Sequence, residues 1–173
     1  DSDDLVWIPL VNPPSLRDAD GARRPSSEWE MHARVYLRRP DIDAVVHTHS
    51  CFATALACQD MPIPPFHYMV AAAGGHSIDV APYATFGTPE LARVAAEALA
   101  VKNACLLSHH GVLAAGKSLQ AALTLATEVE NLAHQYVVVC QLGKPKLISY
   151  EEMNEVLRSF RTYGQQSVEG ESK

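Results

Sequence analysis

The stretch ACLLSHHGVLAAG, residues 104–116, contains two apolar runs separated by two histidines and a glycine. Short apolar runs bounded by turn signals are typical of buried strands. We therefore expect two strand pieces broken at Gly111. The first piece ends in His109 and His110, which places two imidazoles at the exit of an apolar strand.

A second apolar run, DAVVHTHS at residues 43–50, ends in a similar manner. Residues i and i+2 of a strand project to one face, about 6 to 7 Å apart, so His47 and His49 can converge on one metal ion. Alone the pair is a weak signal, because polar residues at a strand exit are also satisfied by water and backbone. His109 or His110 offers the third ligand of a three-histidine zinc site, and the local pattern does not decide between them.

The rest of the chain alternates between strand and helix patterns. Strands are also expected at residues 3–10 and, as a short piece with a turn, at 79–87. Residues 61–75 look extended. Thr88 as N-cap and Pro89 at the first position mark one helix. Helices are expected at residues 26–39, 50–59, 88–101, 118–143 and 149–164. This order predicts an α/β fold with a central sheet covered by helices.

Composition narrows the class of protein. The 173 residues carry a net charge of −6 and no lysine or arginine cluster, which argues against a nucleic-acid partner. Four scattered cysteines without a CxxC pair indicate reduced thiols. No apolar stretch reaches the roughly 18 residues of a membrane span. Without a signal peptide pattern, a cytoplasmic location is expected.

The segment PSSEWEMH, residues 25–32, has both a structural and a functional interpretation. Ser27 and Glu30 fit a capping box, and Glu28 in the first turn complements the helix dipole. Ser26 and Ser27 at a helix N-terminus also suit a phosphate, beside which Glu28 would serve as a proton carrier. Spacing alone favours the structural interpretation, since capped helix starts are common.

Six motifs in order resemble the class II aldolase/adducin family. They are RRPSSEWEMH, DAVVHTHS, FHYMVAAAGG, APYATFGTPEL, LLSHHGVLAAGKSL and FRTYG, and they run from about residue 24 to residue 164. The resemblance is greatest to the branch that acts on L-fuculose 1-phosphate. It implies one domain over residues 1–173, built as a three-layer αβα fold with a central, mostly antiparallel sheet flanked by helices.

The resemblance also implies the site. One zinc ion per subunit would be held by His47, His49 and His110. Glu28 would be the catalytic acid/base and would approach the metal when substrate is absent.

For the substrate, the resemblance implies that Ser26 and Ser27 hold the phosphate and that Phe86 shapes the aldehyde pocket. Tyr68, a second catalytic group, would protonate the aldehyde oxygen. Tyr68 and Tyr163 would reach into a neighbouring subunit's site, in a homotetramer with active sites between subunits.

The expected reaction is reversible cleavage of a ketose 1-phosphate to dihydroxyacetone phosphate and a small aldehyde such as lactaldehyde. A sugar-phosphate 4-epimerase is the alternative within the family. The resemblance implies that such enzymes have aspartate at the position of Glu28, so the glutamate in this chain favours the aldolase. A non-catalytic adducin-like interaction module is a further alternative, disfavoured by the three histidines. Family chains carry an N-terminal helix and a phosphate loop before the strand that opens this sequence, so a truncation is expected.

Overall fold

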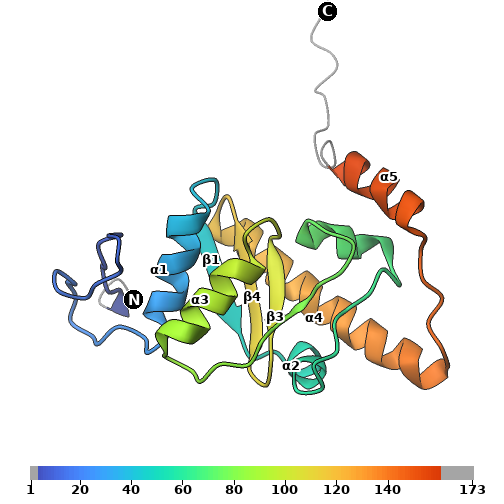
Figure 1. Cartoon of the computed structure of the whole chain (residues 1–173), viewed down its shortest axis with the longest axis horizontal. Coiled ribbons are helices and arrows are strands. Elements are labelled where there is room, and N and C mark those ends of the chain that lie inside the picture. Colours follow the sequence, from blue (N-terminus) through green and yellow to red (C-terminus); the bar gives the residue numbers. More distant parts are fainter. Residues whose placement is uncertain (1–3, 161–173) are drawn as a thin grey trace, which may run out of the picture.

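The computed structural model of the chain describes residues 4–160 and contains a four-stranded sheet in the order β1-β4-β3-β2 (Figure 1). The strands are β1 (Ala44–Thr48), β2 (Val80–Ala81), β3 (Ala104–Leu107) and β4 (Gly111–Gly116). The helices are α1 (Trp29–Arg38), α2 (Cys51–Ala57), the 3-10 helix η2 (Tyr68–Ala73), α3 (Pro89–Ala98), α4 (Leu119–Leu142) and α5 (Tyr150–Phe160).

The sheet is mostly antiparallel, as predicted. β4 pairs antiparallel with both β1 and β3, while the short β2 runs parallel to β3. The register places His47 opposite Leu113 and Thr48 opposite Val112. The C-terminal end of β1 therefore lies against the N-terminal start of β4, which is where the histidines of both segments occur.

Helices cover both faces of the sheet, which confirms the three-layer αβα arrangement (Figure 1). Successive strand residues point to opposite faces, so the strands supply both cores. Cys105 and Leu113 pack against α1 and α3, whereas Leu106 and Val112 pack against α2 and α4. This double burial explains why these strands are apolar throughout rather than alternating.

Most helices begin and end where the sequence predicts. The Thr88 hydroxyl accepts a hydrogen bond from the Leu91 N–H at 3.2 Å, which caps α3. The Ser118 side chain caps α4 in the same way, and Gly143 follows its last residue. None of the helices between residues 4 and 160 combines the length and apolar character that crossing a membrane requires.

Two predicted segments are wrong. Residues 3–10 do not form a strand within the described chain: Trp7 makes a single bridge with Asp20, and Pro9 lacks the N–H that a longer ladder needs. Residues 61–75 are not extended throughout, because η2 occupies their second half. The His67 side chain caps η2 by accepting from the Met69 N–H, and Gly74 ends it with a φ of 83°.

Candidate metal centre

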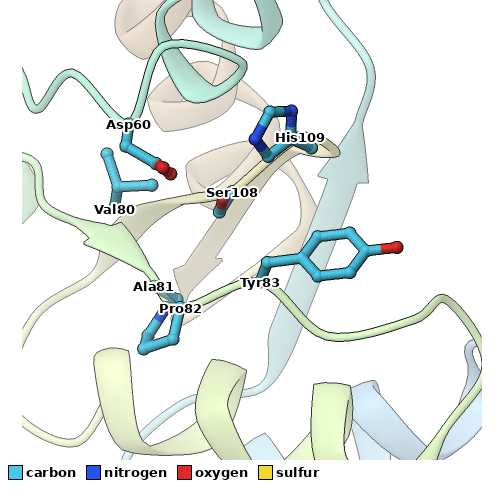
Figure 2. Close-up of a pocket in the computed structure, with 7 residues that line it drawn as sticks. All are labelled: Asp60, Val80, Ala81, Pro82, Tyr83, Ser108 and His109. Carbon is cyan, nitrogen blue, oxygen red and sulfur yellow. The ribbon is translucent and has the colours of Figure 1, made fainter.

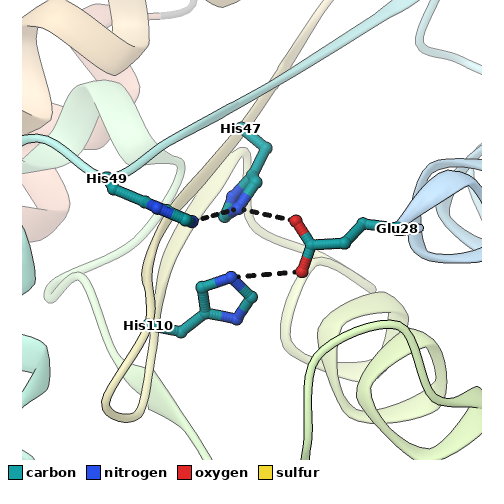
Figure 3. Close-up of side chains that lie close together, drawn as sticks. All are labelled: Glu28, His47, His49 and His110. Atoms are coloured by element: carbon teal, nitrogen blue, oxygen red, sulfur yellow. Dashed lines mark hydrogen bonds and ion pairs between the residues drawn. The ribbon is translucent and has the colours of Figure 1, made fainter. Parts of the chain in front are cut away.

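Four side chains from three separate segments converge at one edge of the sheet (Figure 3). His47 lies in β1, and His49 follows its last residue. His110 directly precedes β4, and Glu28 is the residue before α1. One ligand atom from each side chain lies within 4.8 Å of the other three. The sheet register and the start of α1 together build this cluster.

The contacts inside the cluster are close. His47 Nε2 lies 3.0 Å from His49 Nε2 and 3.2 Å from Glu28 Oε2. Glu28 Oε1 lies 3.1 Å from His110 Nε2. The three imidazole rings have centroids 4.8 to 4.9 Å apart. These separations leave room for one ion between the rings and the carboxylate.

The hydrogen-bonding state of His47 and Glu28 indicates that the cluster can bind a cation. His47 Nδ1 lies 2.8 Å from the Val112 carbonyl oxygen, which only accepts, so Nδ1 carries the proton and donates it. In the neutral ring, Nε2 then presents a lone pair to the centre. Glu28 Oε1 is buried there and accepts no hydrogen bond within the described residues, despite its contact with His110. A lone pair on His47 and a buried carboxylate oxygen that accepts no hydrogen bond fit a divalent metal ion, with the Val112 contact orienting one ligand.

The protonation states favoured for His47 and His110 also fit metal binding. Burial lowers the pKa of His47, with the Val112 hydrogen bond acting in the opposite direction. Burial likewise lowers the pKa of His110. A metal ligand must be the neutral imidazole, so the surrounding protein favours the binding form.

Gly111 is required by the close approach of the two histidine segments. A Cβ atom at this position would lie 2.3 Å from the Thr48 carbonyl oxygen and 2.9 Å from His49 Cδ2. Any side chain would push β1 away from β4 or displace the His49 ring. The glycine after the paired histidines therefore sets the spacing between ligands.

The structure shows which of the two adjacent histidines faces the cluster, a choice that the local sequence pattern left open. His109 has a φ of 53°, and this left-handed turn directs its ring to the edge of Tyr83, with ring centroids 5.9 Å apart. His110 alone joins His47 and His49.

Comparison with known proteins agrees with this site. Residues 1–137 match the class II aldolase and adducin N-terminal domain family. The chain belongs to this family. A cluster of three histidines and a glutamate, with a geometry consistent with a divalent metal ion, thus lies in a class II aldolase/adducin fold.

Relatives of known activity cover much of the chain. A 5-methylthioribulose-1-phosphate/5-deoxyribulose-1-phosphate aldolase of Rhodospirillum rubrum is 54% identical over 83% of this chain and 65% of its own length. An L-fuculose phosphate aldolase of Escherichia coli K12 is 50% identical over 81% of this chain and 66% of its own length. A solved L-fuculose 1-phosphate aldolase superposes with a TM-score of 0.79 at 44% identity, over 82% of this chain and 66% of that chain. The present chain therefore spans slightly less than two thirds of the length of each of these three proteins.

The start of α1 differs from the predicted capping box. Glu30 pairs with Arg34 at 2.7 Å instead of reaching back, and no side chain caps the helix at Glu28. The Ser26 hydroxyl accepts from the Glu28 N–H at 3.2 Å. The capping prediction is wrong because an i,i+4 ion pair competes for the Glu30 carboxylate. Glu28 is left to face the histidines.

The other predicted site residues are spread out. Ser27 and Phe86 line the same cavity of about 400 Å³ as Glu28, His49 and His110. Ser26 lines a different cavity, beside Trp7 and Trp29. Tyr68 is 46% exposed and lines a cavity against α5, outside the metal centre. Tyr163 lies outside the described residues. The roles given to these residues stay predictions.

Sequence reasoning missed Glu130 of α4. Its two carboxylate oxygens accept from the Phe52 and Ala53 N–H groups, each at 2.9 Å. These donors belong to the first turn of α2, which begins two residues after His49. Glu130 therefore fixes the segment that carries one ligand. Glu130 and Phe52 are 78 positions apart in the chain, so no local pattern reveals the contact.

We expect Glu130→Gln to weaken metal binding about 10-fold, in the range known for groups that orient metal ligands. An amide has one acceptor oxygen for two N–H groups, so the His49 segment loses a restraint. Chelator competition gives the affinity, and the visible spectrum of the Co²⁺ form reports ligand geometry. Glu128→Gln on the same helix is the control. Equal affinity and an unchanged spectrum would show that Glu130 serves α2 alone.

Proposed function

We propose that the chain forms the catalytic domain of a metal-dependent class II sugar-phosphate aldolase. It cleaves a ketose 1-phosphate reversibly to dihydroxyacetone phosphate and a small aldehyde. The observation that carries the proposal is the convergence of three histidines and Glu28, whose buried Oε1 accepts no hydrogen bond within the described residues. The sugar-phosphate aldolases among its relatives support the same reaction class.

His47, His49 and His110 would hold the ion, and we propose zinc, one per subunit, because three imidazoles with an open position suit it. Bound there, a divalent ion supplies Lewis acidity, which stabilises the negative charge on the ketose oxygen as the carbon–carbon bond breaks. Imidazole ligands also suit other divalent ions, so the metal is part of the test.

Glu28 would move the proton at the reacting carbon. In cleavage, the bond between C3 and C4 breaks and its electron pair remains with C3, which then takes a proton. The Glu28 side chain is only 13% exposed, and its carboxylate oxygens lie 3.2 Å from His47 Nε2 and 3.1 Å from His110 Nε2, within the reach that proton transfer requires. The protonated carboxyl group would give that proton in cleavage, and the carboxylate would remove it in synthesis.

The remaining groups would act on the ends of the substrate. We assign the phosphate to Ser26 and Ser27, of which Ser27 lines the metal cavity. Phe86 lines the same cavity and would shape its aldehyde side. Tyr68 and Tyr163 would complete the site of a neighbouring subunit in a homotetramer, where Tyr68 exchanges a proton with the aldehyde oxygen. The exposure of Tyr68 leaves it available for that role.

Two related substrate types deserve direct comparison. L-Fuculose 1-phosphate would yield lactaldehyde, and 5-deoxyribulose 1-phosphate would yield acetaldehyde. The names of the related aldolases include these two substrates. A 4-epimerase would break and re-form the same bond without releasing triose phosphate. Glutamate at position 28 favours the aldolase over the epimerase, and the complete histidine set disfavours an interaction module.

The test is a substrate screen on metal-replete protein. Both ketose phosphates and a pentulose 5-phosphate are supplied, and the release of dihydroxyacetone phosphate is followed with a coupled dehydrogenase. We expect triose phosphate from at least one ketose 1-phosphate, and its loss on chelation. An epimerised pentose phosphate without triose would identify the epimerase. Metal-loaded protein without either product would reject both enzymes.

A further inference from the structure

The short helix α2 is joined at its two ends to two of the three histidine segments. Its N-cap residue, Ser50, directly follows His49. At its other end, the Ala57 carbonyl oxygen accepts a hydrogen bond of 3.1 Å from the N–H of His109, the residue before the third histidine of the cluster. The N–H of Asp60 also donates to Ala57 at 3.1 Å, and Asp60 and His109 line one cavity beside this end of the helix (Figure 2). A displacement of α2 therefore reaches two of the proposed metal ligands.

Helix α4 holds α2 in place by two contacts. The carboxylate oxygens of Glu130 accept hydrogen bonds from the Phe52 and Ala53 N–H groups, each at 2.9 Å. About one turn further along α4, the His134 ring stacks on the Phe52 ring, with centroids 4.0 Å apart and an interplanar angle of 13°. Both contacts act on the first turn of α2, so α4 sets the position of the helix that follows His49.

The Ser50 hydroxyl is the ordinary acceptor for these same N–H groups. An N-cap serine accepts from the second or third residue of its helix, and in α2 these residues are Phe52 and Ala53. Ser50 has the extended backbone of a capping residue, with φ −67° and ψ 145°, yet its side chain makes no capping hydrogen bond within the described residues. Glu130 takes both donors instead. Two acceptors thus compete for one pair of N–H groups.

The hydroxyl groups around the start of α2 are left without partners. Four buried side-chain oxygen atoms between residues 4 and 160 make no hydrogen bond, and one of them is Glu28 Oε1. The other three are the hydroxyl oxygens of Thr48, Ser50 and Thr54, which flank His49 in the chain. A buried hydroxyl without a partner destabilises the state that contains it. Returning the Ser50 hydroxyl to the start of α2 would remove part of that cost.

We propose that Ser50 is a positioning residue that controls how readily the metal ion enters and leaves the cluster. In a closed arrangement, Glu130 caps α2 and His49 faces the other histidines. In an open arrangement, the Ser50 hydroxyl accepts from the Ala53 N–H, Glu130 releases α2, and the helix shifts together with His49. Ion binding favours the closed arrangement, because only there do all three imidazoles face one point. The inference rests on the metal site of the proposed function and does not depend on the aldol reaction.

The experiment measures metal release from the full chain loaded with Co²⁺. Excess chelator is added without substrate, and the loss of visible absorption gives the release rate. Ser50→Ala deprives the open arrangement of its cap, so release should slow about 5-fold. Ser50→Thr keeps a hydroxyl at the N-cap and should restore a rate within about 2-fold of the wild type. Glu130→Gln gives up one acceptor and should accelerate release about 10-fold, but by less in a chain that also carries Ser50→Ala.

Ser118→Ala is the matched control, because the Ser118 hydroxyl caps α4 by accepting from the Ala121 N–H at 3.1 Å. It should lower the melting temperature of the metal-free protein and leave metal release unchanged, whereas Ser50→Ala should not lower that temperature. Circular dichroism shows whether each variant is folded.

Three results would overturn the inference. The first is a wild-type release rate in Ser50→Ala. The second is an equal acceleration by Glu130→Gln with and without the Ser50 hydroxyl, which would show that the two acceptors do not compete. The third is a lower melting temperature in Ser50→Ala, which would show that this hydroxyl already has a partner in the closed arrangement. A chain that takes up no Co²⁺ would instead reject the metal site, and the inference with it.

Discussion

His110→Ala is expected to reduce the metal content of the protein from about one ion per chain to well below that value. The variant removes one of three imidazoles that face the centre, and its neighbours cannot replace it, because the next ring points to Tyr83. Loss of a direct ligand should exceed the 10- to 100-fold cost of losing an orienting group, so retro-aldol activity should fall by more than about 100-fold. Elemental analysis after dialysis gives the metal content.

His109→Asn is the matched control for this experiment. It removes the adjacent imidazole, and asparagine accepts the φ of 53° with less strain than alanine does. Metal content should remain about one per chain. If the two variants lose metal equally, the assignment of the third ligand to His110 is wrong.

Glu28→Gln should separate metal binding from chemistry. The three histidines remain, so the protein should still take up about one ion per chain. The amide cannot carry the proton at C3, and kcat should fall by about 10²- to 10⁴-fold, the range for loss of a general acid/base. Exchange of a dihydroxyacetone phosphate proton with deuterated water should decrease in parallel, as followed by NMR.

Glu30→Gln tests the specificity of that effect. Glu30 lies on the same helix, but its carboxylate pairs with Arg34 and lies outside the cluster. We expect wild-type exchange and cleavage rates. A Glu28→Gln variant that exchanges the proton normally would show that another group is the base.

The sequence predicted the central sheet covered by helices and the approach of the histidine segments for a clear physical reason. Strands buried on both faces are continuously apolar, so histidines at their ends stand out, as His47 and His110 do. The i, i+2 rule then places His47 and His49 on one side of β1. These features depend on short-range geometry, which local sequence encodes.

The features that local sequence did not reveal depend on contacts between distant segments. The choice between His109 and His110 follows from the left-handed conformation of His109, whose N–H donates a hydrogen bond to the Ala57 carbonyl oxygen of α2. Glu130 reaches α2 from another helix. At the N-terminal end, Trp7 lies in a strand-like run, but only Asp20 pairs with it in the described chain.

The cluster joins two layers of the fold. Glu28 directly precedes α1, whereas His47 lies in β1 and His49 and His110 lie next to the ends of β1 and β4. An ion held by all four side chains would act as a removable cross-link between a helix and the strands beneath it. Because unfolded chains lack this arrangement, free metal at 100 times its Kd would add about 2.7 kcal/mol to the free energy of unfolding. Metal supply would then govern how long the protein survives heating as well as how fast it turns over substrate.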